Sequence, residues 1–304
     1  MKPALSVIFF TVSSGAGLGL LVWLLIASIM ADHIRMDGAT FYKGALIAGL
    51  FITAGLVSST LHLANRKNAI YSLTRIKTSW LSREGLLAVL LYPLASLHLA
   101  ALHFGWSQIT PVTLWLLIAI AVAILFCTGM IYGCLRTVPR WNTWMTPTKY
   151  VLFGLMSGAV LLPAVLSLRP AGVGPIGKPM VAIILLALGL ALYLVYLLKH
   201  PRVTHTMNDA LGFKQGNVRL LDVGHSHGTF LTNEFGFSVA RERARLLRWV
   251  AINCGFILPM VLCYFTKWFW AASTICVAGL LVERWLFFAE AEHVVRLYHG
   301  QQRV

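Results

Sequence analysis

The chain has 304 residues, of which 58% are hydrophobic and only 12% are charged, and its formal net charge is +15. A soluble domain carries roughly a quarter charged residues because its surface must meet water, so this composition excludes a soluble domain. The basic residues lie in the connections between apolar runs and not on one face with interleaved aromatic residues, which argues against a nucleic-acid-binding protein.

Eight apolar runs, each long enough to cross the ~30 Å hydrocarbon core of a bilayer, predict an all-α, polytopic bundle of eight transmembrane helices. The bundle forms a single membrane domain over residues 1–304. The first run follows one lysine and lacks a small-x-small exit, so we expect a retained helix and not a cleaved signal peptide. The predicted spans are 5–31, 44–64, 84–103, 110–135, 148–168, 179–199, 248–268 and 271–296.

Small residues cluster in the first predicted span, where they favour close contact with another helix. They are Ser13, Ser14, Gly15, Gly17 and Gly19. Pro163 and Pro259 fall inside other spans, where a kink is tolerated if neighbouring helices satisfy the freed carbonyl group.

The Lys and Arg residues predict the orientation of the chain in the membrane. With eight spans, both termini and the second, fourth and sixth connections share one side, which holds nineteen Lys and Arg residues against five on the other. Connections rich in Lys and Arg stay in the cytoplasm. We therefore expect a multi-pass protein of the bacterial inner membrane with cytoplasmic N- and C-termini.

The sixth connection, residues 200–247, is the one long segment that the predicted spans leave outside the membrane. It ends in a basic, helix-like run at 238–248, which also suits contact with anionic headgroups. The segment is too short for an independent catalytic domain, so we interpret it as a candidate docking segment for a partner.

The sequence gives little support for a redox centre or a metal within this chain. None of the five cysteines forms a C-x-x-C pair, so neither an iron–sulfur cluster nor a zinc site is expected. A bis-His haem needs two histidines on neighbouring helices, whereas His98 and His103 share the third span. His225 and His227 lack cysteine or clustered acids nearby, so we expect no metal there either.

Ionisable residues at membrane depth are costly and are therefore candidates for function. His62 lies near the end of the second predicted span and Glu84 opens the third, so the antiparallel arrangement places both at one depth near the cytoplasmic side. Trp80, Arg83 and Ser59 flank this pair. An imidazole and a carboxyl group at one depth can take up the protons that a quinol releases on oxidation. The alternative is that His62 caps a helix and Glu84 pairs with a nearby arginine at the headgroups.

The last predicted span contains a second group of charges around Glu283 and Glu290. These two carboxylates are seven residues apart and share one helix face. Either Glu283 pairs with a cation on a neighbouring helix, or the two carboxylates form part of a proton path.

Several strings along the chain resemble the membrane anchor subunit of dimethyl sulfoxide reductase-type complexes. The Trp-Leu-Ser-Arg-Glu string at 80–84 and the Glu-Arg-Trp-Leu-Phe-Phe-Ala-Glu string at 283–290 are fairly specific, and the resemblance covers nearly the whole chain. The strings are Ser59–Leu63, Ser79–Glu84, Pro139–Trp141 and Val282–Ala291, together with Ser6–Thr11 followed by Ser14–Gly17.

The resemblance implies an eight-helix subunit, without haem or an iron–sulfur cluster of its own, that exchanges electrons with menaquinone or ubiquinone. It implies two partners, a four-cluster, ferredoxin-like iron–sulfur subunit and a molybdopterin catalytic subunit. The family's quinol-site histidine and glutamate would fall on His62 and Glu84. The family also includes anchors of sulfite-oxidising complexes. The charge asymmetry puts the His62–Glu84 face in the cytoplasm and so favours a quinone-linked sulfite dehydrogenase over a dimethyl sulfoxide reductase with exported catalytic subunits.

Two rival functions stay open. A secondary transporter would use Glu283 and His62 as ion-coupling groups, although the duplicated halves typical of such proteins are not visible in the sequence. A passive structural anchor would contain no quinone site at all.

Overall fold

The structure is a computed structural model that describes residues 3–30, 36–61, 71, 74–170, 177–199, 205–222, 239–299 and 302. Within these residues the chain forms helices and no strand. Among the same residues, eight helical segments are long and apolar enough to cross a membrane. The predicted all-α bundle of eight spans is therefore confirmed.

The helices follow one another in an order close to the predicted one. The first six spans are α1 (Leu5–Ile29), α3 (Gly38–Leu61), α4 (Trp80–Phe104), α5 (Ile109–Gly133), α6 (Met145–Leu166) and α7 (Met180–Leu198). The seventh joins α10 (Val239–Ile252), the π-helical turn η2 (Asn253–Ile257) and α11 (Leu258–Phe265), and the eighth is α12 (Phe269–Ala289). Two short helices, α8 (Met207–Leu211) and the 3₁₀ helix η3 (Val294–His299), lie outside the spans.

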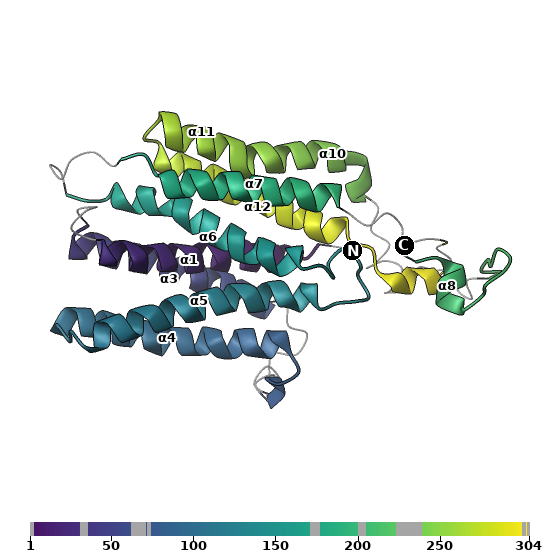
Figure 1. Ribbon diagram of the computed structural model, residues 1–304, viewed down its shortest axis with the longest axis horizontal. Coiled ribbons are helices and arrows are strands. Elements are labelled where there is room, and N and C mark those ends of the chain that lie inside the picture. Colours follow the sequence, from purple (N-terminus) through teal and green to yellow (C-terminus); the bar gives the residue numbers. More distant parts are fainter. Residues whose placement is uncertain are drawn as a thin grey trace.

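The long helices run side by side, with α4 and α5 on one flank and α7, α10 and α11 on the other (Figure 1). Helix α1 packs against α3, α5, α6 and α12, so it forms the centre of the bundle. Helix α4 begins and helix α12 ends at the same end of the bundle, and α8 with η3 extends beyond that end (Figure 1).

Glycines on α1 and α6 let these two well-buried helices approach closely. A Cβ atom on Gly19 would lie 1.9 Å from the carbonyl oxygen of Gly154, and one on Gly158 would lie 2.0 Å from the carbonyl carbon of Gly19. Each helix has a Gly-x-x-x-Gly spacing, which is typical of close packing between membrane helices. The close contact predicted from the small residues of the first span is confirmed.

Several predicted boundaries differ from the observed ones, and local hydrogen bonds explain two of the differences. The third span starts at Trp80 because Ser79 caps its first turn, where the serine hydroxyl group accepts a hydrogen bond from the Ser82 backbone N–H at 3.3 Å. Glu84 therefore lies one turn inside the helix and does not open it. The last span ends at Ala289, not at 296. The polypeptide then turns away, and the Val294 backbone N–H donates to the Thr137 carbonyl group at 3.0 Å.

From Val239 on, the basic run predicted to end the sixth connection is the start of the seventh span. Helix α10 begins at Val239 and continues through η2 into α11. Pro259 follows directly after the π-helical turn. Proline has no N–H to donate to the preceding turn, and the wider turn lies where that hydrogen bond is lost.

Candidate functional site

Glu84 is a buried carboxyl group one turn from the start of α4. It is 3% exposed, and the hydroxyl group of Thr128 on α5 donates a hydrogen bond to its Oε1 atom. Within the part of the chain that the structure describes, Glu84 forms no ion pair. A carboxyl group held by a hydroxyl group can gain or lose a proton without breaking a salt bridge.

The Thr128 hydroxyl group lies between two acceptors. Its oxygen is also 2.9 Å from the carbonyl oxygen of Ile124, one turn earlier on α5. A hydroxyl group has one proton to donate and lone pairs to accept with. Thr128 can therefore donate to an ionised Glu84, or donate to Ile124 while a protonated Glu84 donates to Thr128. The geometry is compatible with both protonation states of the carboxyl group.

Arg83 and Trp80 lie beside Glu84 but do not bind it. The guanidinium group of Arg83 donates to the backbone carbonyls of Ile76 and Lys77 at 2.8 Å each. Its Cζ atom lies 4.2 Å from the centre of the Trp80 ring. Arg83 thus fixes the segment before α4 to the first turn of the helix. The alternative in which Arg83 neutralises Glu84 is not what the structure shows.

The lipid-facing surface around the start of α4 is apolar and open. Trp80 meets the ring of Phe126 on α5 edge to face, with 5.7 Å between ring centres. Leu81 on α4 is more than half exposed, and a Cβ atom on Gly85 would meet nothing within 4 Å. A lipid-soluble molecule can therefore approach this end of α4 from the bilayer.

The other two predicted residues belong to the end of α3 and the segment after it. Ser59 is half-buried in the last turn of α3, at the same end of the bundle as the start of α4 (Figure 1). His62 lies outside the described residues, so its distance from Glu84 stays a prediction. The structure brings Trp80, Arg83 and Glu84 together.

Thr128 is the member of this group that sequence reasoning missed. It lies in an almost continuous apolar run, 109–133, where a single threonine does not indicate a functional role. The depth of Thr128 in the membrane could have identified it. The predicted fourth span is antiparallel to the third, so the last residues of the fourth span lie at the level of Glu84.

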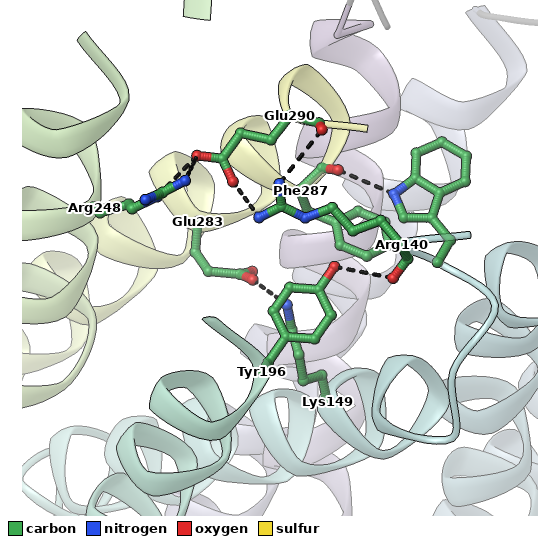
Figure 2. A network of polar contacts seen from close by, with 8 residues as sticks. Arg140, Lys149, Tyr196, Arg248, Glu283, Phe287 and Glu290 are labelled. Atoms are coloured by element: carbon green, nitrogen blue, oxygen red, sulfur yellow. Dashed lines mark hydrogen bonds and ion pairs between the residues drawn. The ribbon is translucent and has the colours of Figure 1, made fainter. Parts of the chain in front are cut away.

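A cluster of charged side chains lies between α6 and α12, inside the bundle (Figure 2). Lys149 on α6 donates to Glu283 Oε1 on α12 at 2.6 Å, and both side chains are fully buried. Of the two alternatives for Glu283, this contact is the ion pair with a cation on a neighbouring helix. Lys149 lies inside the predicted fifth span, 148–168, and α6 begins four residues before it, at Met145.

Glu290 forms the outer end of this charge cluster, just beyond α12. Its carboxylate binds Arg140, in the connection between α5 and α6, and also Arg248 on α10, whose Nε atom lies 2.9 Å from Oε1 (Figure 2). The neighbouring Trp141 donates from its indole N–H to the carbonyl oxygen of Phe287 at 3.0 Å. Glu290 therefore joins three parts of the chain at the end of the bundle where α4 starts.

Aromatic rings surround the Lys149 ammonium group. Its nitrogen lies 3.8 Å from the ring centre of Tyr196 and within 6 Å of the ring centres of Phe153, Tyr193 and Phe287. Aromatic faces attract a cation, so the rings and Glu283 together offset the loss of water around Lys149. This arrangement is well suited to holding the helices together.

The two histidines of α4 lie toward its other end and are not a matched pair. His98 is buried, and its Nδ1 atom is 2.8 Å from the Thr113 hydroxyl oxygen on α5, whereas His103 is exposed. Within the described ranges, no three His, Cys, Asp or Glu side chains are grouped to hold a metal ion. His225 and His227 lie outside those ranges.

The described part of the 200–247 segment packs against the C-terminal part of the protein. Thr206 and Asp209 form a reciprocal cap at the start of α8, and the Thr206 hydroxyl and backbone N–H lower the pKa of Asp209. The Met207 backbone N–H donates to the carbonyl oxygen of Gln302 at 3.0 Å. This ordered corner lies beyond the end of the bundle where Glu84 and Glu290 are found (Figure 1).

Comparisons with known proteins all match subunits of dimethyl sulfoxide reductases or of a sulfite dehydrogenase. The model of the family described as DMSO reductase anchor subunit (DmsC) matches residues 1–289. The protein is 31% identical to a sulfite dehydrogenase subunit of Allochromatium vinosum, over 98% of its own length and 99% of that relative. It is 24% identical to an anaerobic dimethyl sulfoxide reductase subunit of Haemophilus influenzae, over 53% of its own length and 58% of that relative. No solved structure matches the sequence.

Proposed function

The chain belongs to the dimethyl sulfoxide reductase anchor subunit family, and on that premise we propose that it is the quinone-reactive membrane anchor of a molybdopterin oxidoreductase complex. The observation that carries the proposal is the buried Glu84 carboxyl group, hydrogen-bonded to Thr128 with no ion pair to another described residue. In this function the protein binds quinone or quinol and handles its protons, while an iron–sulfur subunit exchanges the electrons.

Glu84 acts as a proton acceptor and donor for the quinone ring. Oxidation of a quinol to a quinone releases two protons and two electrons. Glu84 takes up one proton, with Thr128 switching its hydroxyl proton to the Ile124 carbonyl as the carboxyl group becomes neutral. The two electrons pass to the iron–sulfur partner, and the reverse sequence applies when quinone is reduced.

His62 completes the proton handling in this proposal. In this role it exchanges the proton of the second quinone oxygen, to which a neutral imidazole is suited near neutral pH. Trp80 and Ser59 line the entrance from the bilayer, and Arg83 keeps Trp80 in place through the contact of 4.2 Å between them.

Two further subunits are expected to dock on the end of the bundle that carries Glu84. The ordered corner formed by α8 and η3 extends beyond this end, and it includes part of the predicted docking segment, 200–247. We propose that a ferredoxin-like iron–sulfur subunit binds here and in turn holds the molybdopterin catalytic subunit. The charge asymmetry supports a cytoplasmic position for this end.

The substrate of the whole complex is best interpreted as sulfite. The relative that aligns over nearly its full length is a subunit of a sulfite dehydrogenase, whereas the dimethyl sulfoxide reductase relatives align over about half of theirs. A cytoplasmic docking face supports the same choice. Electrons would then run from sulfite toward quinone.

The proton path through Glu283 and Glu290 stays a prediction with less support. Both carboxylates are held in ion pairs, and such a group must part from its cation before it can carry a proton. The same pairs count against a transporter in which Glu283 is an ion-coupling group. A passive anchor remains the rival that an experiment must exclude.

The test compares quinone-linked with dye-linked turnover in the complete complex. Replacing His62 or Glu84 with glutamine should lower the quinone-linked rate by about 100-fold or more, the usual contribution of a general acid or base. The dye-linked rate of the soluble subunits should not change. Glu292→Gln, a half-buried carboxylate beyond α12, is the matched control. Unchanged quinone-linked rates in both variants would leave the protein a passive anchor.

A further inference from the structure

A small cavity lies between α1, α6 and α12, beside the charge cluster. About 10 Å³ of it is open to the centre of a water molecule, which is close to the least space that one water needs. Its polar lining consists of Thr11 on α1, Tyr150 and Ser157 on α6, and Arg284 on α12. Four helix-borne polar groups thus surround a space of the size of one water molecule.

Two of the lining residues carry buried donors that form no hydrogen bond to another described residue. Within the described residues, Tyr150 Oη and Arg284 Nη1 have no hydrogen-bond acceptor. The Arg284 guanidinium lies over the Tyr150 ring, with 3.7 Å from Cζ to the ring centre. Arg284 Nη1 forms an ion pair with Glu283 Oε2 at 3.4 Å, without the geometry of a hydrogen bond, and Glu283 Oε2 also has no hydrogen-bond donor among the described residues. A buried donor left unsatisfied is destabilising, so two of them at one cavity indicate a missing acceptor.

The other two polar lining residues, Thr11 and Ser157, have hydroxyl oxygens that can accept hydrogen bonds. The Thr11 hydroxyl donates to the Ile8 carbonyl at 3.1 Å, and the Ser157 hydroxyl donates to the Phe153 carbonyl at 2.8 Å. Because each hydroxyl proton is already used, the two oxygens can still accept hydrogen bonds, and both residues line the cavity. The cavity therefore has two donors and two acceptors to offer, which is the full complement of a water molecule.

We propose that this cavity binds one ordered water molecule, which accepts from Tyr150 and Arg284 and donates to Thr11 and Ser157. The water supplies the hydration that Arg284 lacks inside the bundle, where Lys149 already occupies the closer side of Glu283. A small anion would also suit the cations, but the space favours water. The inference does not depend on the quinone site.

The sign of one substitution tests the proposal. Tyr150→Phe removes only the hydroxyl group of a residue that lines the cavity. If water is bound there, the variant loses a satisfied hydrogen bond, and the melting temperature of the purified protein should fall by about 2–4 °C. If the cavity is dry, removal of an unsatisfied donor should leave the melting temperature unchanged or raise it, and the proposal fails. Tyr196→Phe, whose hydroxyl donates to the Arg140 carbonyl at 3.4 Å, is the matched control for a hydroxyl with a protein partner.

An experimental density map at a resolution that reveals water gives the second test. A peak within hydrogen-bond distance of both Tyr150 Oη and Arg284, lost in Tyr150→Phe, would support the proposal. An empty cavity would overturn it. A peak that scatters anomalously after bromide replaces chloride in the buffer would also overturn it, because the occupant would then be an anion.

Discussion

Glu84 and Glu283 are both buried carboxyl groups on membrane-spanning helices, yet they have opposite kinds of partner. Glu283 binds the ammonium group of Lys149 at 2.6 Å inside a shell of aromatic rings. Glu84 meets a threonine hydroxyl group and no described cation. The first arrangement keeps Glu283 ionised and holds two helices together, whereas the second allows Glu84 to gain or lose a proton without breaking an ion pair. The partner, and not burial alone, separates a structural carboxylate from a candidate proton carrier.

The largest expected effect on stability separates the two carboxyl groups directly. Glu283→Gln leaves Lys149 buried without a counter-charge, and loss of one partner from a buried pair costs about 3–5 kcal/mol of unfolding free energy. Glu84→Gln should cost less than about 1 kcal/mol, because an amide oxygen still accepts from Thr128. Unfolding of the purified protein in detergent measures both. Equal losses would contradict the distinction.

Removing both members of the Lys149–Glu283 pair tests whether the stability lost in Glu283→Gln comes from the unpaired charge of Lys149. The double variant Lys149→Met with Glu283→Leu should recover part of the stability that Glu283→Gln loses, since Lys149 is no longer left unpaired, while Arg284 still loses its ion pair with Glu283. Lys149→Met alone serves as the control and should be strongly destabilised. A double variant no more stable than either single one would show that the pair does more than balance charge.

A smaller effect is expected at the hydroxyl group beside Glu84. Thr128→Val keeps the shape of the side chain but removes the group that serves both protonation states of Glu84. We expect quinone-linked turnover to fall about tenfold, the equivalent of one hydrogen bond. Thr113→Val, on the same helix beside His98, is the matched control. If both variants behave alike, Thr128 has no special role.

The smallest effect is expected at the solvent end of the charge cluster. Arg248 is 42% exposed in its side chain, and Glu290 keeps Arg140 as a second partner. Arg248→Gln should therefore cost less than about 1 kcal/mol, whereas Arg140→Gln, at a buried guanidinium, should cost clearly more. Unfolding measurements on the two variants check the order, and a reversed order would contradict it.

The sequence was sufficient for the helix bundle because long apolar runs leave a polypeptide few alternatives in a membrane. It also placed Trp80, Arg83 and Glu84 at one end of the third span. It did not reveal Thr128 or Lys149 as partners, because pairing across helices depends on rotation about each helix axis and on close packing such as that of Gly19 against Gly154. The helix start at Trp80 depended on a cap by Ser79 that apolar periodicity does not register.

We propose that the Glu84 carboxyl group changes protonation as quinone is reduced or oxidised. Infrared difference spectroscopy of the complete complex, recorded between its oxidised and quinol-reduced states, observes this directly. We predict a carboxyl band that disappears in Glu84→Gln and persists in Glu292→Gln. A band that persists in Glu84→Gln, or quinone-linked turnover with no carboxyl band at all, would show that Glu84 is not the group that changes protonation.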